Sequence, residues 1–232
     1  MTMPLKSETV FERDYDCFPA DEVSPEEVQT GGADQSAENK SLSVTAPLKQ
    51  EHDHIGRMMN VLASFCMKLD RREPIQVDDL DSIWDYLKIY VDARHNGKEE
   101  SLLYPEFMAE SGDREKKMIG SILGEHETER MYVNVIGRLI RHYRDAELNA
   151  DTWLVVNLSK YITLQKEHMD KENTILFSIV ENRLSARKKA GLLEAFKCAD
   201  EIGFGAVRSD EFQGLLVSLE KNYQNPRLAG SH

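Results

Sequence analysis

One pattern of histidine and glutamate occurs twice in this chain, about 73 residues apart. Each copy has a Glu-His pair that is followed, 43 positions later in the first copy and 42 in the second, by a His-x-x-x-Glu motif. The six residues concerned are His52, His95, Glu99, His126, His168 and Glu172. Because imidazole and carboxylate groups are common metal ligands, a repeat of this composition is first of all a metal-site signal.

The spacing within each motif predicts where these side chains point. Residues four apart lie on the same face of a helix, so His95 and Glu99 share one face, and His168 and Glu172 share another. From Thr45 onward the apolar residues recur at helical spacing, which predicts an all-α fold with two long helices per copy. Short connections favour an antiparallel up-down four-helix bundle with the six side chains at its centre.

The sequence also predicts where the helices begin and end. The first helix opens at Thr45-Ala-Pro47, with the Thr45 hydroxyl as its cap, and the second is expected to kink near Pro105. The third helix follows Ser111-Gly-Asp113, and Asn149-Ala-Asp151 opens the fourth. Two shorter helices come next, one over 186–202 capped by Ser185 and one that starts at Ser209. No stretch has the pattern of a strand.

These patterns predict four parts. Residues 1–44 hold ten Asp or Glu residues against three Lys or Arg and few aliphatic residues, so we expect a largely irregular extension. The bundle is expected over 45–184, C-terminal helices packed on it over 185–225, and a tail over 226–232.

Composition limits the partners and the location. The formal net charge of -12 disfavours nucleic acid and anionic membranes, which both reward positive charge. No apolar run approaches the ~18 residues of a membrane span, and the N-terminus lacks the apolar stretch of a secretory signal. The three cysteines are widely spaced and suggest no disulfide framework. We therefore expect a cytoplasmic protein with reduced thiols.

Six imidazole and carboxylate ligands are too many for one tetrahedral metal, and they suit two metals bridged by carboxylates. Mixed nitrogen and oxygen ligation is compatible with iron, manganese or zinc, whereas calcium and magnesium prefer oxygen ligands alone. A single His-x-x-x-Glu motif is usually a surface pair on a helix. Two matched copies among apolar core positions favour metal binding, because an unpaired buried histidine or glutamate is costly.

The motifs resemble those of the hemerythrin family, in its HHE cation-binding branch. Glu51-His52-Asp-His-Ile55 resembles that branch's opening Glu-His-x-x-Ile, and His95-Asn-Gly-Lys-Glu99-Glu-Ser-Leu-Leu-Tyr-Pro105 resembles its His-x-x-Lys-Glu-Glu-x-x-Leu-Phe-Pro signature. Glu125-His126-x-x-x-Arg130 and His168-x-x-Lys-Glu172 resemble the later motifs. The resemblance covers roughly residues 46–225.

The resemblance implies a non-haem diiron centre in a four-helix bundle. His52 and His95 would ligate one iron ion, and His126 and His168 would ligate the other. Glu99 and Glu172 would bridge the two iron ions, together with an oxo or hydroxo group. No catalytic residue beyond these metal ligands is implied.

Two departures from the oxygen-carrying hemerythrins bear on function. Those proteins have a third-helix His-x-x-x-His and a fourth-helix His-x-x-x-x-Asp, whereas here Arg130 stands four residues after His126 and the last pair is His168-x-x-x-Glu172. One imidazole fewer leaves coordination positions open, and open positions allow reaction with small ligands. We therefore expect binding of, or reaction with, a small oxidant (dioxygen, hydrogen peroxide or nitric oxide) in oxidative or nitrosative stress handling.

Other readings stay open at this point. The chain could be an oxygen- or iron-sensing module without turnover, or its metal could be structural; an electron donor or protein partner is unidentified. His54 is an alternative to His52, and Glu100 to Glu99. Glu51 and Glu125 either hydrogen-bond ligand imidazoles or are exposed charges. Lys98 and Lys171 are expected to reach solvent. Tyr90, Tyr104, Tyr132 and Tyr161 are expected to be core aromatics, with a radical or proton donor near oxidised iron as the alternative.

Overall fold

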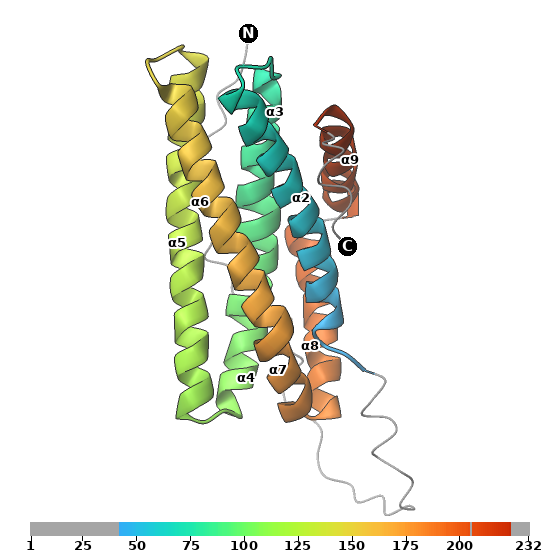
Figure 1. Cartoon of the computed structure of the whole chain (residues 1–232). Coiled ribbons are helices and arrows are strands. Elements are labelled where there is room, and N and C mark those ends of the chain that lie inside the picture. The colour runs from blue at the N-terminus through green and yellow to red at the C-terminus, as the bar shows by residue number, and fades with distance from the viewer. Residues whose placement is uncertain (1–41, 205, 224–232) are drawn as a thin grey trace, which may run out of the picture.

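The computed structural model describes residues 42–204 and 206–223, and every regular element within them is helical. Figure 1 shows four long antiparallel helical segments. The first is α2, the second is α3 continued by α4, the third is α5, and the fourth is α6 continued by α7. The helices are α2 (Ala46–Asp70), α3 (Val77–Asp85), α4 (Tyr104–Ala109), α5 (Asp113–Arg144), α6 (Ala150–Lys171), α7 (Phe177–Arg183), α8 (Ala186–Ala199) and α9 (Ala206–Asn222). The predicted all-α, up-down four-helix bundle is confirmed.

The interior of the bundle is divided along its length. One apolar cluster fills the end where α3 begins, and it includes Ile55, Phe65, Leu87, Ile136 and Leu158. A second cluster fills the other end, and it includes Leu48, Leu103, Phe107, Ile119 and Phe177. On α2, His52 lies in sequence between Leu48 of one cluster and Ile55 of the other, so the two clusters flank the level at which the repeated motifs meet.

Two of the four helical segments of the bundle contain π-helical turns at the repeated motifs. One turn spans Glu99–Leu103 and the other Glu172–Leu176, and each closes with an i→i+5 bond, from the Tyr104 N–H to the Glu99 carbonyl and from the Phe177 N–H to the Glu172 carbonyl. A further π-helical segment, Tyr86–Asn96, leads into the first motif. Such turns are common at functional sites. A kink was predicted near Pro105. The structure has a π-helical turn just before Pro105, and the second copy has the same kind of turn without a proline, so a proline is not required for it.

The capping prediction is right for one helix and wrong for another. The Ser185 side-chain oxygen accepts a bond from the Lys188 N–H at 3.3 Å and so caps α8. Thr45 precedes α2 as predicted, but its hydroxyl makes no cap. Instead the Thr45 N–H and hydroxyl both donate to Glu181 Oε1, at 2.8 Å each. These bonds tie the start of α2 to α7.

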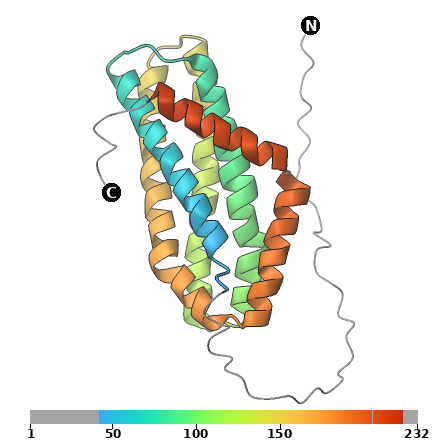
Figure 2. The same cartoon turned by 90° about the vertical axis from the view of Figure 1, so that its right-hand side faces the viewer.

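The chain's last two described helices lie on the outside of the bundle. Figure 2 shows α8 beside the bundle and α9 crossing it obliquely over α2. Phe212, Leu216 and Leu219 of α9 belong to the larger apolar cluster, and Arg57 of α2 pairs with Glu220 at 2.6 Å. A π-helical segment spans Asp200–Phe204 and α9 begins at Ala206, so the break predicted at 203–205 is wrong for residues 203 and 204, and α9 starts before Ser209.

Several expectations fall on other parts of the chain. The predicted extension over 1–44 lies outside the described residues except for its last three, and the predicted tail over 226–232 lies entirely outside them. No helix in the described part of the chain is both long enough and apolar enough to cross a membrane. Cys66 is a buried free thiol, whereas Cys198 is disulfide-bonded, so the prediction of reduced thiols is wrong for Cys198.

Candidate metal centre

The structure brings the six predicted residues together in the middle of the bundle. His52 is 3% exposed and the other five are fully buried. They form two overlapping groups that share both glutamates: His52, His95, Glu99 and Glu172 in one, and Glu99, His126, His168 and Glu172 in the other. Within each group the candidate ligand atoms all lie within 4.8 Å of one another. The chain therefore has buried His/Glu clusters suitable for a metal site.

The four imidazoles meet in pairs. His52 Nε2 lies 2.9 Å from His95 Nε2, and His126 Nε2 lies 3.1 Å from His168 Nε2. The rings of each pair meet edge to face, with centroids 4.6 and 4.7 Å apart. Each half of the repeat therefore supplies one pair of inward nitrogens.

The outer nitrogen of each ring has an oxygen partner. His95 Nδ1 lies 2.9 Å from Glu51 Oε2, and His168 Nδ1 lies 3.1 Å from Glu125 Oε2. The other two contacts are His126 Nδ1 to Glu100 Oε1 at 2.7 Å and His52 Nδ1 to Asn173 Oδ1 at 2.9 Å. Oxygen acceptors on the outer side require a proton on each Nδ1, so a neutral ring presents the lone pair of Nε2 to the centre.

When both rings of a pair are neutral, this arrangement places lone pair against lone pair. Two acceptors less than about 3.2 Å apart, the normal hydrogen-bond range, repel each other unless a proton or a cation lies between them. A metal-binding histidine usually binds the metal through one ring nitrogen and donates the N–H of the other nitrogen to a carboxylate or carbonyl oxygen. The donor set therefore fits a cation.

The two glutamates each lie between the histidine pairs. Glu172 Oε2 is 3.2 Å from His52 Nε2 and 3.3 Å from His168 Nε2. Glu99 Oε1 is 3.7 Å from His95 Nε2, and Glu99 Oε2 is 3.5 Å from His126 Nε2. Among the described residues, no hydrogen-bond donor satisfies either oxygen of Glu99 or Oε2 of Glu172. Buried carboxylate oxygens of this kind need positive charge, which a metal ion supplies.

Burial and mutual repulsion shift the pKa values at the centre. Burial raises the pKa of Glu99 well above its usual range, and the neighbouring Glu172 carboxylate raises it further. Burial would also raise the pKa of Glu172, but His168 and His52 hold it below its usual range. Burial lowers the pKa of His95 to about 4, which favours the neutral ring that a metal requires. For His168 burial also acts to lower the pKa, but Glu172 and Glu125 outweigh it and raise that pKa well above its usual range.

A comparison with known protein families matches residues 43–180 to the hemerythrin HHE cation binding domain. This match covers more than half of the chain and includes all six candidate ligands. The chain belongs to the hemerythrin HHE family. No curated protein and no solved structure matches it at a significant level.

In this hemerythrin HHE chain Arg130 does not face the centre. Its guanidinium pairs with Asp92 at 3.0 Å, Glu100 at 3.0 Å and Glu127 at 2.8 Å. Because Glu100 Oε1 also contacts His126 Nδ1, Arg130 is linked to the centre through the Glu100 carboxylate. Glu100 is thus an outer partner of a ligand histidine, and the structure gives no support to it as an alternative to Glu99.

The position after each of the two shared glutamates has the same role in both copies of the hemerythrin HHE repeat. Glu100 follows Glu99 and holds His126, whereas Asn173 follows Glu172 and holds His52. Each of these residues holds a histidine from the other half of the repeat. The repeat in the sequence did not reveal this shared role, because Glu100 has a carboxylate where Asn173 has an amide.

Other predicted residues lie away from the centre. His54 Nδ1 contacts the Tyr90 hydroxyl at 3.0 Å, and burial lowers the pKa of His54. His142 is half exposed and pairs with Glu147 at 2.7 Å. Neither belongs to the metal-binding groups. The structure therefore favours His52 over His54 on α2.

Two further buried polar residues, Tyr104 and Glu129, lie near the centre, and only Glu129 was not singled out from the sequence. The Tyr104 hydroxyl donates to Glu172 Oε1, although Tyr104 was expected to be an ordinary core aromatic. Glu129, about one turn after His126, is 2% exposed and accepts a bond from Asn96 Nδ2 at 3.1 Å. Burial raises the pKa of Glu129. Glu129 lies three positions after His126 and therefore on the same face of the helix, so helical spacing could have identified it from the sequence.

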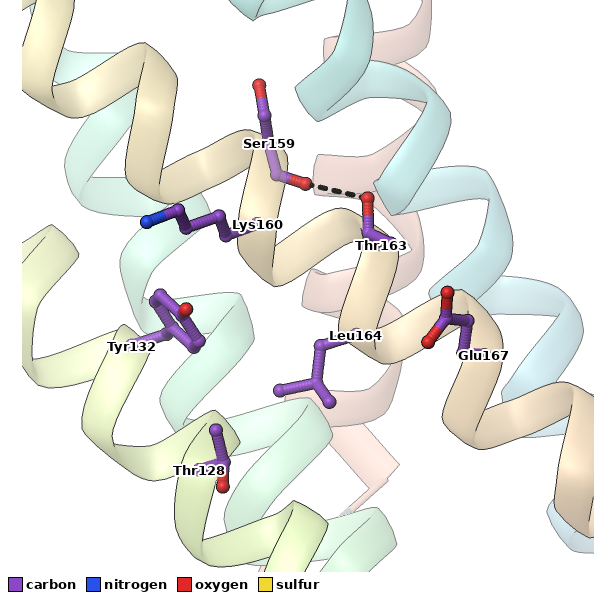
Figure 3. A pocket seen from close by; sticks show the side chains of 7 residues that line it. All are labelled: Thr128, Tyr132, Ser159, Lys160, Thr163, Leu164 and Glu167. Carbon is purple, nitrogen blue, oxygen red and sulfur yellow. Dashed lines mark hydrogen bonds between the residues drawn. The ribbon is translucent and has the colours of Figure 1, made fainter.

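The surface groove of the hemerythrin HHE bundle in Figure 3 is separate from this centre. It lies between α5 and α6, and its walls contain none of the six candidate ligands. Its lining residues are Thr128, Tyr132, Ser159, Lys160, Thr163, Leu164 and Glu167.

Proposed function

We propose that this protein holds two iron ions between its four histidines and two glutamates, and that it binds or reacts with a small oxidant there. His52 and His95 would hold one iron ion, and His126 and His168 the other. Glu99 and Glu172 would bridge them. The observation that carries the proposal is the convergence of four Nε2 atoms and two buried carboxylates, since this set of donors suits cations.

The residues present fit iron, because each group would offer it two imidazole nitrogens together with carboxylate oxygens. Two histidines and a carboxylate with open positions are typical of non-haem iron.

The protein's own residues shape the chemistry that such a pair of ions supplies, which is electron transfer to or from a bound oxidant. Each ion would be held by two imidazoles and the two shared carboxylates, and this small number of protein ligands would leave room for a small oxidant. The Tyr104 hydroxyl would hold the proton of its bond to Glu172 and so fix that bridge in place. The apolar clusters on both sides of the centre limit the entry of water.

The test is to load the purified protein anaerobically with ferrous iron, count the metal per chain, and record optical spectra with air, peroxide, azide and nitric oxide. About two iron ions per chain, with bands that respond to these ligands, is the expected result. Fast consumption of peroxide would identify an enzyme, and a stable reversible oxygen adduct would identify a carrier or sensor. A site that takes zinc alone and is inert to all four ligands would contradict the proposal.

A further inference from the structure

The glutamates that contact His95 and His168 have different surroundings in the two halves of the repeat. In the second half Glu125, which binds His168, pairs with Lys171 at 2.6 Å, and the Lys171 side chain is 47% exposed. In the first half Glu51, which binds His95, accepts a bond from Lys98, and the Lys98 side chain is 3% exposed. Lys98 was expected to reach solvent, and that prediction is wrong because the C-terminal helices cover it.

The difference comes from Asp200, the first residue after α8. Its carboxylate binds the Arg94 guanidinium with two bonds, at 2.8 and 3.1 Å, and it accepts bonds from Lys98 Nζ at 3.1 and 3.3 Å. Arg94 also lies 3.5 Å from Glu51 Oε1. Two cations one helical turn apart are therefore held between Asp200 on one side and Glu51 on the other.

The second half has no counterpart of this arrangement among the described residues. Arg94 immediately precedes His95, and the equivalent residue before His168 is Glu167, which is exposed. A negative charge at that place cannot bind a carboxylate as Arg94 does. The family match ends at residue 180, so Asp200 lies outside the part of the chain that it covers.

We propose that Asp200 is a positioning residue of the metal centre: through Arg94 and Lys98 it fixes Glu51 against His95, and it makes the His52–His95 position the tighter of the two metal positions. The His126–His168 position is then the one that exchanges its metal. This inference rests on the proposed dimetal site. Outer partners of metal ligands typically change metal affinity by about 10–100-fold, so an unequal outer arrangement implies unequal affinity.

The test compares the full-length parent protein with Asp200→Asn and with the control Asp210→Asn, which changes an exposed aspartate on α9. Each protein is loaded anaerobically with ferrous iron alone, and the release of iron to a chelator is followed in time. We expect a fast and a slow phase of equal size in the parent. Asp200→Asn should speed the slow phase by about 10–100-fold and leave the fast phase unchanged. Asp210→Asn should change neither.

A second measurement separates this inference from the proposed function. In the metal-free protein the side-chain Nδ1–H signals of His95 and His168 can be followed by NMR. Asp200→Asn should shift or broaden the His95 signal and leave that of His168 in place. An unchanged His95 signal, or equal acceleration of both iron phases, would overturn the inference. If the parent binds no iron but the His95 signal responds, the proposed function fails and the positioning role stands.

Discussion

At the level of single residues, the two nitrogens of each central imidazole have separate roles. The inner Nε2 faces another Nε2, and the outer Nδ1 meets an oxygen of Glu51, Glu100, Glu125 or Asn173. The outer contact fixes both the proton and the orientation of the ring, as it does in metal proteins generally. The centre is therefore set by residues that do not themselves face the cavity between the histidines.

Glu172→Ala should remove one or both metal ions from the protein. Glu172 Oε2 lies between His52 and His168, so its loss affects both positions. His54→Ala and His142→Ala should leave the metal content unchanged, because both histidines lie away from the centre. The measurement is metal per chain after anaerobic loading. If His54→Ala empties the site and His52→Ala does not, the assignment on α2 is wrong.

The sequence predicted the central residues better than their surroundings. Helical spacing and the repeat were enough to select all six residues that the structure brings together. The contacts of Lys98 and Tyr104 could not be predicted in the same way. These depend on which helix lies opposite and how it is rotated, and Lys98 in particular is buried by a segment about 100 positions later in the chain.

At the level of elements, the starts of α5, α6 and α8 agree with the predicted turn and capping residues, whereas α9 starts before Ser209. The π-helical turns do not follow from the sequence pattern. Each of these turns adds one residue relative to an α-helix, so that neighbouring positions such as Leu102, Leu103 and Tyr104 are all buried. Apolar periodicity assumes a constant 3.6-residue repeat and therefore cannot locate such a turn.

The packing of α5 against α3 allows a sharp prediction. A Cβ at Gly137 would lie 2.5 Å from Trp84 Nε1 and 2.6 Å from Trp84 Cε2. Trp84 would have to move and would lose its bond to the Val133 carbonyl, which is 2.9 Å long. Gly137→Ala should therefore lower the free energy of unfolding by about 1–3 kcal/mol, as measured by chemical denaturation.

Gly124 on the same helix is the matched control, because a Cβ there meets nothing within 4 Å. Gly124→Ala should raise the free energy of unfolding by about 0.5–1 kcal/mol, since alanine favours the helix. Equal effects of the two substitutions would show that Trp84 can move aside without cost.

At the level of the whole molecule, the C-terminal helices join the bundle through two kinds of contact. Helix α9 adds Phe212, Leu216 and Leu219 to the larger apolar cluster. At the end of α8, Asp200 binds Arg94 and Lys98, and both of these contact Glu51, the outer partner of His95. The sequence predicted that helices over 185–225 pack on the bundle. It did not predict the contact of Asp200 with Arg94 and Lys98, because those two residues lie about 100 positions earlier in the chain.

Leu216→Ala should loosen α9. Leu216 is 2% exposed, so removal of its side chain should cost about 2–5 kcal/mol. Val217 is 58% exposed, and Val217→Ala should change stability little. Amide hydrogen exchange is the measurement: exchange should speed up in 206–222 of the Leu216 variant, with α5 and α6 still protected. Equal loss of protection throughout would show that α9 and the bundle unfold as one unit.

The exchange of partners between the halves has a consequence for the origin of the chain. The first half holds a histidine of the second through Glu100, and the second holds one of the first through Asn173. A single helical hairpin could not complete its own site, whereas two identical hairpins related by a twofold axis could. Gene duplication and fusion of such a homodimer would preserve a finished centre, and each copy could then diverge, as Arg94 and Glu167 have.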